Sequence, residues 1–216
     1  EVIDSRGNPT VAAKVNLDNS TSGIALVPSG ASTGQHEANE KRDEDETRYL
    51  GKGVLSAVES INKEISELLK GKDAEDLLAN DRILIESDGT ENKNNFGANA
   101  ILAVSMACAK AASNSKKIPL HKFINSKYSE FCHKEVVSTL PIPMMNIING
   151  GAHANNGLRI QEFMIRPDKA KTFSEAVRIC FLVINNLRKL IKKLGHSTSV
   201  GDEGGFAPMI SDNENA

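Results

Sequence analysis

The sequence predicts a mixed fold of the α+β and α/β classes, in which an α+β domain precedes the first part of an α/β barrel. A β-hairpin pattern followed by helical patterns opens the chain of 216 residues. From residue 140 onward, continuous apolar runs bounded by Gly and Pro alternate with a helical pattern, as in strands buried on both faces of a parallel sheet. The 77 residues of 140–216 are too few for a closed barrel, which needs roughly 250.

The N-terminal domain begins with two β-prone runs, at residues 11–17 and 24–27, and the polar cluster between them predicts an antiparallel hairpin. Apolar residues recur at three- and four-residue steps over 54–69, which indicates an amphipathic helix, and 77–85 indicates a shorter one. Residues 98–112 are rich in Ala, so high helix propensity and small side chains together predict a buried, closely packed helix.

The C-terminal part contains apolar runs at residues 144–148 and 160–165, which predict two buried strands. Thr172 then begins a long helical pattern, and the segment 200–206 is Gly-rich and acidic. We therefore divide the chain into an N-terminal α+β domain at 1–125, a linker at 126–139 and the start of a barrel at 140–216.

Charge and cysteine content restrict the functional classes. The chain has 28 acidic and 26 basic residues, which argues against a nucleic-acid-binding protein, since such proteins carry a basic surplus. No apolar stretch approaches the roughly 20 residues of a membrane-spanning helix, and no signal-peptide pattern is visible at the first residues. Cys108, Cys132 and Cys180 are widely spaced, as expected of reduced thiols in a cytoplasmic protein. The mixed-charge run 37–48 predicts a solvated face.

The segment 28–34, PSGASTG, directly follows a predicted strand. Its two glycines and three hydroxyl side chains offer free backbone amides and oxygen ligands, which suit an anion or a metal ion. It is not a Walker A loop, because no Lys-Ser/Thr pair follows the last glycine. A simple strand-ending turn is the alternative.

Three further polar residues stand at or inside the predicted strands of the C-terminal part. His153 follows Asn149-Gly150-Gly151, where it can hold a phosphate or carry a proton, or can be an ordinary surface residue. Gln161 and Glu162 interrupt an apolar run, and a carboxylate buried there must pair, bind a metal ion or stay protonated. Strand alternation places these two side chains on opposite faces, although a strand end can bring both to one rim.

Two adjacent carboxylates, Asp202 and Glu203, stand between glycines in the segment VGDEGGF. Neighbouring acids on a loop suit a metal site or an acid with a raised pKa. A polar turn without function is the alternative interpretation.

Taken in order, the segments DSRGNPTV, VPSGASTG, GANAILAVS, NIINGGAH, QEFMI and VGDEGG resemble those of the enolase family, and the resemblance extends over nearly the whole chain. It implies an N-terminal capping domain and an eight-stranded TIM-type barrel with a ββαα start. It further implies a homodimer that dehydrates 2-phosphoglycerate reversibly to phosphoenolpyruvate in glycolysis, with two Mg²⁺ ions.

The resemblance also implies a role for each motif residue. Glu203 would be the general acid, assisted by Glu162 near the leaving hydroxyl group. His153 would contact the substrate, and Gln161 would line its pocket. Ser32 would ligate the second Mg²⁺, and His36 would at most support that loop. In the family the base lysine, the phosphate-binding residues and the three carboxylates of the first Mg²⁺ would follow Ala216.

Three interpretations therefore compete. In the first, the chain is part of an enolase and belongs to a Mg²⁺-dependent lyase. In the second it is a truncated product without catalytic activity, prone to aggregate, or an interaction module that acts through its N-terminal domain. The third, a general phosphate-binding α/β protein, is disfavoured because no motif matches a nucleotide-binding fingerprint. The gene sequence beyond the codon for Ala216 separates the first two.

Overall fold

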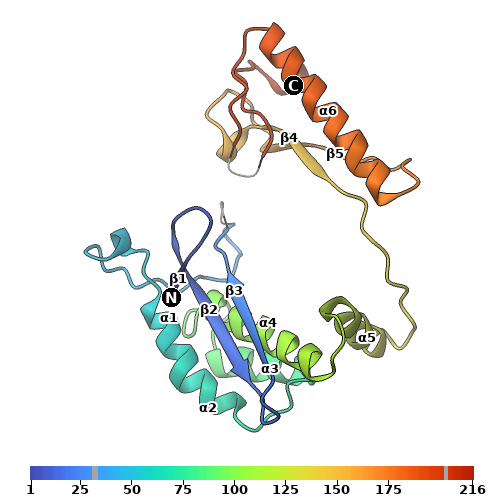
Figure 1. The fold of residues 1–216 in the computed structure, drawn as a ribbon. Coiled ribbons are helices and arrows are strands. Elements are labelled where there is room, and N and C mark those ends of the chain that lie inside the picture. The colour runs from blue at the N-terminus through green and yellow to red at the C-terminus, as the bar shows by residue number, and fades with distance from the viewer. Residues whose placement is uncertain (31–33, 202–203) are drawn as a thin grey trace. The chain divides into compact units, whose positions relative to one another are not determined.

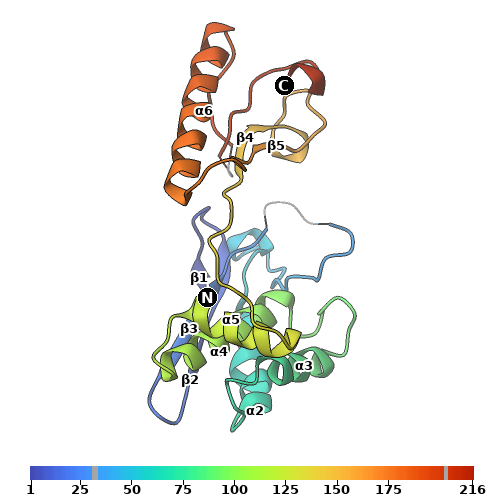
Figure 2. The ribbon, with the colours of Figure 1, turned by 90° about the vertical axis from the view of Figure 1, so that its right-hand side faces the viewer.

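The computed structural model describes residues 1–30, 34–201 and 204–216. The chain forms two compact units, residues 1–138 and 139–216, which are described separately (Figures 1 and 2). Both contain helices and strands. No helix in the described ranges is long and apolar enough to cross a membrane.

The first unit contains a three-stranded antiparallel sheet with the order β1-β2-β3. Strand β2 (Pro9–Asn16) pairs with β1 (Val2–Ile3) on one side and with β3 (Ser22–Val27) on the other. The pairing of Val11 with Val27 and of Asn16 with Ser22 confirms the predicted hairpin.

Helices cover one face of this sheet. The predicted helix over residues 54–69 is confirmed, but a π-helical segment, Ile61–Ile65, interrupts it between α1 and α2. The shorter and the Ala-rich helices are confirmed as α3 and α4. The bounds are α1 (Leu55–Ser60), α2 (Ser66–Leu69), α3 (Leu77–Asp88), α4 (Ala98–Ser115) and α5 (Leu120–Cys132). Helix α5 therefore occupies the first part of the predicted linker.

Helix α4 packs closely against β3 because small residues meet at the contact. Ala107 and Ala111 are fully buried on the helix, and Gly23 faces them from the strand. A Cβ atom on Gly23 would lie 2.3 Å from the carbonyl oxygen of Ala107 and 2.3 Å from the amide nitrogen of Ala111. The backbones of two elements therefore touch at this point.

We expect Gly23→Ala to destabilise the chain by about 3 kcal/mol, because backbone atoms on both sides cannot yield to an added methyl group. The urea midpoint of residues 1–216 measures this. Gly34→Ala is the control, since its Cβ would meet only the flexible end of Glu37, at 3.2 Å. Equal stability of the two variants would contradict this close contact between helix and strand.

Asp88 ends α3 and holds the connection to α4. Its buried carboxylate accepts hydrogen bonds from the amide of Phe96 at 2.7 Å, the amide of Thr90 at 3.1 Å and the hydroxyl group of Thr90. Burial alone would raise the pKa of Asp88, but these hydrogen bonds outweigh burial and lower the pKa.

The lowered pKa of Asp88 predicts acid sensitivity. The carboxylate stabilises the fold above its unfolded pKa of about 3.9, and this contribution disappears as the pH falls through the lower pKa of the folded state. We expect the urea midpoint of Asp88→Asn to depend less on pH below about 4 than that of the unsubstituted chain. Parallel pH profiles for the two proteins would contradict the expectation.

The second unit contains β4 (Met145–Asn149), β5 (Glu162–Ile165) and α6 (Phe173–Lys193). The two predicted strands form, but they pair antiparallel and neither is buried throughout, whereas their apolar runs had predicted a parallel sheet buried on both faces. That expectation was wrong because their connection contains only the short 3₁₀ turn Gly151–His153. A parallel pair needs a longer crossover, usually a helix.

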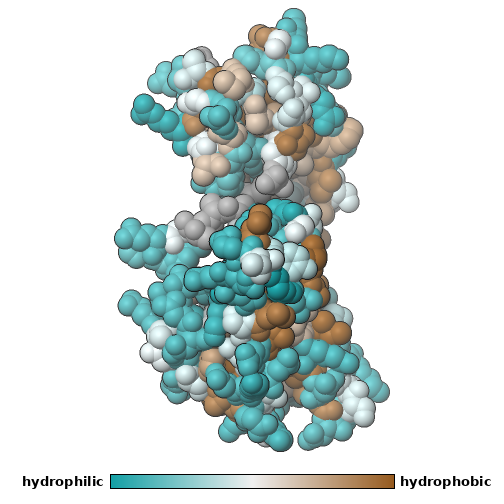
Figure 3. All heavy atoms as spheres, turned by 90° about the vertical axis from the view of Figure 1, so that its left-hand side faces the viewer, coloured by the Kyte–Doolittle hydropathy of each residue, from teal (hydrophilic) through white to brown (hydrophobic). Residues whose placement is uncertain are grey.

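Helix α6 begins as predicted, with the hydroxyl oxygen of Thr172 accepting a hydrogen bond from the amide of Glu175 at 3.1 Å. Its inner face buries Ala176, Cys180 and Ile191. Several other apolar side chains of the helix are exposed, among them Phe173, Val177, Phe181, Leu182 and Leu190. Apolar patches also interrupt the hydrophilic surface on the face of the molecule drawn in Figure 3.

The chain ends in the 3₁₀ turn Asn213–Asn215. There Asp212 accepts a hydrogen bond from the amide of Glu214, at 3.0 Å.

Candidate active site

Strand β4 carries contacts to two of the predicted motifs in the second unit: the nearby β5, which begins at Glu162, and the distant segment 200–206. Gly201 and Gly205, which flank Asp202 and Glu203 in the sequence, are joined by a hydrogen bond from the amide of Gly201 to the carbonyl group of Gly205, at 3.1 Å. Phe206 then lies parallel to β4: its amide donates to Ile147, and its carbonyl group accepts from the amide of Asn149, both at 2.8 Å. The segment that contains Asp202 and Glu203 is therefore attached to β4 at its described residues.

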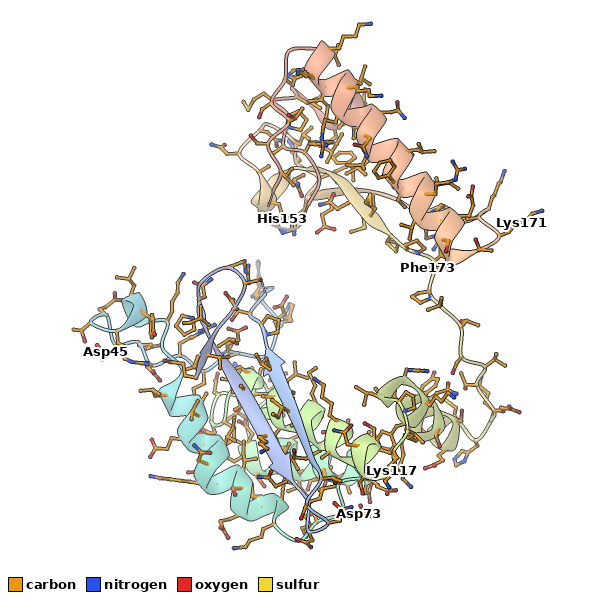
Figure 4. All side chains as sticks on the ribbon, viewed as in Figure 1. Asp45, Asp73, Lys117, His153, Lys171 and Phe173 are labelled. Carbon is orange, nitrogen blue, oxygen red and sulfur yellow. The ribbon has the colours of Figure 1, made fainter. Side chains whose placement is uncertain are left out.

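His153, Gln161 and Glu162 form a second cluster at the same end of β4, where Glu162 pairs with Asn149. Figure 4 labels His153 on the connection between β4 and β5. The side-chain amide nitrogen of Gln161 lies 2.7 Å from Nε2 of His153, and Oε1 of Glu162 lies 3.5 Å from Nδ1 of the same ring. The structure thus brings together three of the predicted site residues.

The contacts of His153 indicate which of its two ring nitrogens carries the proton of the neutral ring. With its amide nitrogen toward the ring, Gln161 donates to Nε2 of His153, and the proton of a neutral imidazole is then on Nδ1, facing Glu162. Glu162 begins β5, so Gln161 lies just before the strand and strand alternation does not separate the two side chains. This is the strand-end arrangement that the sequence had left open.

Glycines make this close packing possible. A Cβ atom on Gly150 would lie 2.4 Å from the carbonyl oxygen of Ile160 and 2.5 Å from Cβ of Leu158. Gly151 has a φ of +53°, and its amide donates to Leu158 at 2.8 Å. The Gly-Gly pair before His153 therefore lets the connection return against β4.

Comparison with known proteins gives the same order of motifs. Residues 1–124 match the sequence model of the enolase N-terminal domain, and residues 137–216 match that of the enolase C-terminal TIM barrel domain. The chain belongs to the enolase family. Over its full length it is 60% identical to the enolase of Pelagibacter ubique (strain HTCC1062), across 218 aligned positions. It spans about half the length of that curated relative.

These matches confirm the predicted fold class: an enolase N-terminal domain followed by the start of the enolase barrel domain. The structure agrees in having a mixed first unit and two strands and a helix in the second. The described strands of the second unit form a two-stranded sheet rather than a closed barrel.

Two of the predicted enolase site residues, Ser32 and Glu203, lie outside the described residues. The described residues at the start of the PSGASTG segment, 28–30, are held by hydrogen bonds to Ser29. Ser29 donates to Glu40 at 2.9 Å and accepts a hydrogen bond from Arg42, and its carbonyl group accepts one from Arg6. His36 is exposed.

The side chain of Arg42 connects Ser29, at the start of the PSGASTG segment, with several other segments. It also donates to the carbonyl groups of Pro9 at 2.7 Å and Lys52 at 2.8 Å, and contacts Glu40 at 2.7 Å. The expectation that residues 37–48 form only a solvated face was therefore wrong for this part of the run. Charge density in a sequence does not reveal which side chains find buried carbonyl partners.

The described residues do not by themselves form a metal site. Within the described ranges, no group of three or more His, Cys, Asp or Glu side chains is placed to hold a metal ion. Glu162 and His153 supply two such side chains.

Sequence reasoning missed a cluster of asparagines in this enolase chain. Asn149 and Asn156 are almost completely buried. The side-chain amide of Asn156 donates to the backbone carbonyl groups of Asn149 at 2.8 Å and of Pro208 at 2.9 Å. Asn213 accepts from the amides of Arg159 at 2.9 Å and Ile160 at 3.2 Å. The one available signal was Asn149 itself, a polar residue that ends an apolar run.

Proposed function

We propose that the chain is part of an enolase that dehydrates 2-phosphoglycerate reversibly to phosphoenolpyruvate, as a cytoplasmic homodimer that uses two Mg²⁺ ions. The observation that carries the proposal is that β4 joins both groups: Glu162 of the His153–Gln161–Glu162 cluster pairs with Asn149, and Phe206, which follows the segment that contains Glu203, pairs with Ile148. Family membership and the identity of 60% to a curated enolase support it.

In this proposal the chain supplies the acid side of the reaction. Glu203 protonates the leaving hydroxyl group, which requires a carboxyl group kept neutral by its surroundings. Glu162 assists at the same hydroxyl group. His153 contacts the substrate, and Gln161 lines the pocket; both are held by their mutual contact of 2.7 Å.

The base lysine and the primary metal ligands would lie after Ala216, as the resemblance implies. Ser32 would ligate the second Mg²⁺.

A second candidate is a truncated product without catalytic activity, or an interaction module. The exposed apolar side chains of α6, such as Phe181 and Leu190, favour it, because uncovered apolar surface promotes association. The gene sequence after Ala216 decides between the two: an in-frame stop codon would favour the second candidate.

A chimera tests the proposal in cells. Residues 1–216 replace the matching half of the Pelagibacter ubique enolase, to give a full-length protein. We expect this chimera to restore the growth of an enolase-deficient bacterium on glucose. A chimera that accumulates in folded form but does not support growth would contradict the proposal.

A further inference from the structure

Asn149 ends β4 with a polar side chain that is only 1% exposed. Its amide nitrogen donates to the carbonyl group of Gly204 at 2.7 Å. Gly204 directly follows Glu203 in the sequence. A buried side chain of the barrel start therefore holds the backbone next to the residue proposed as general acid.

The orientation of this amide is fixed from both sides. Its oxygen accepts a hydrogen bond from the side-chain amide of Asn146 at 2.6 Å, so its nitrogen must face Gly204. The backbone of Asn149 is fixed as well, since its amide donates to Phe206 at 2.8 Å and its carbonyl group accepts from Asn156 at 2.8 Å. The side chain thus offers its donor in one direction.

Both described ends of the acidic segment lie against the same side chain. A Cβ atom on Gly201 would lie 2.8 Å from the amide nitrogen of Asn149, and one on Gly205 would lie 3.1 Å from it. Gly205 also has a φ of +72°, which favours glycine. The glycines that flank Asp202 and Glu203 are therefore required for the backbone to approach Asn149.

We infer that Asn149 is a positioning residue that fixes the backbone on either side of Glu203 through its hydrogen bond to Gly204 and its contacts with Gly201 and Gly205. The inference rests on the proposed function, in which Glu203 is the general acid. Asn149 takes no part in proton transfer. It acts through the described residues that flank Glu203 in the sequence, and a displacement of about 1 Å at a reacting group can cost about 100-fold in rate.

The test uses Asn149→Asp in the enolase chimera. An aspartate of the same shape still accepts the bond from Asn146, but it places a carboxylate oxygen against the carbonyl oxygen of Gly204. We expect kcat for dehydration to fall about 100-fold. Exchange of the α-proton of 2-phosphoglycerate with deuterium in the solvent, which does not need Glu203, is expected to change less than about threefold, because the substitution disturbs only the contacts of Asn149 with the residues that flank Glu203.

Two further variants sharpen the experiment. Asn155→Asp, at an exposed position of the same connection, is the matched control and is expected to leave both rates unchanged. Gly201→Ala disturbs the same contact from the other side, so it decides the matter if Asn149→Asp fails to fold. We expect Gly201→Ala to lower dehydration selectively as well.

A loss of dehydration that is larger than the loss of α-proton exchange distinguishes a positioning role of Asn149 from a general structural role. A merely structural residue would lower exchange and dehydration together, and this result for a folded variant would overturn the inference. Unchanged dehydration in folded Asn149→Asp would also overturn it. Failure of the proposed function looks different, since the unsubstituted chimera would then catalyse neither reaction, and the inference would fall with it.

Discussion

Glu203→Gln in the enolase chimera is expected to lower the formation of phosphoenolpyruvate by about 10²- to 10⁴-fold, the usual contribution of a general acid. Glutamine keeps the size of the side chain but cannot give a proton to the leaving hydroxyl group. In the proposed function a base other than Glu203 abstracts the α-proton, so deuterium exchange at the α-carbon should remain measurable.

The two rates are measured on one sample, by the ultraviolet absorbance of phosphoenolpyruvate and by NMR detection of deuterium in 2-phosphoglycerate. Glu130→Gln, which changes an exposed carboxylate on α5, is the control and should match the unsubstituted chimera. Loss of exchange together with dehydration would show that Glu203 is not the acid but part of substrate binding or folding.

The isolated chain of residues 1–216 is expected to form no phosphoenolpyruvate above the uncatalysed rate, even with excess Mg²⁺. The resemblance places the base lysine and the primary metal ligands after Ala216, and the described residues offer no metal cluster in their place. Removing members of one catalytic unit abolishes most of the rate, because their effects are not additive.

This second prediction is checked with purified chain whose helix content is confirmed by circular dichroism, so that inactivity is not mistaken for misfolding. The enolase chimera, assayed under identical conditions, is the positive control. Mg²⁺-dependent turnover by the isolated chain would mean that residues within 1–216 supply the base, and would require a different assignment of the site.

Local patterns predicted much of the fold. The β2–β3 hairpin, the Ala-rich helix α4 and the capped start of α6 each depend on neighbouring residues: alternation, helix propensity and an N-terminal hydroxyl group. The direction in which β4 and β5 pair was predicted wrongly, since apolar runs show burial but not strand direction. That direction depends on the connection between the strands.

The candidate site could be predicted only in part, because local sequence patterns reveal some of its residues but not the contacts between distant segments. His153, Gln161 and Glu162 stood out because polar side chains interrupted apolar or Gly-rich segments, and the structure brings these three together. The bond from Asn149 to Gly204 was not predictable, because it joins positions 55 residues apart. Likewise, nothing in the charged run around Arg42 indicated that its guanidinium group would donate hydrogen bonds to Ser29, at the start of the PSGASTG segment, and to Pro9.

The central claim is that this chain supplies the acid half of an enolase site, and the rate of phosphoenolpyruvate formation by the purified chimera tests it most directly. The assay uses saturating 2-phosphoglycerate and Mg²⁺, with the Pelagibacter ubique enolase as reference. We predict a kcat within about tenfold of the reference, a difference of about 1.4 kcal/mol in activation free energy. A folded chimera that forms no phosphoenolpyruvate would contradict the account.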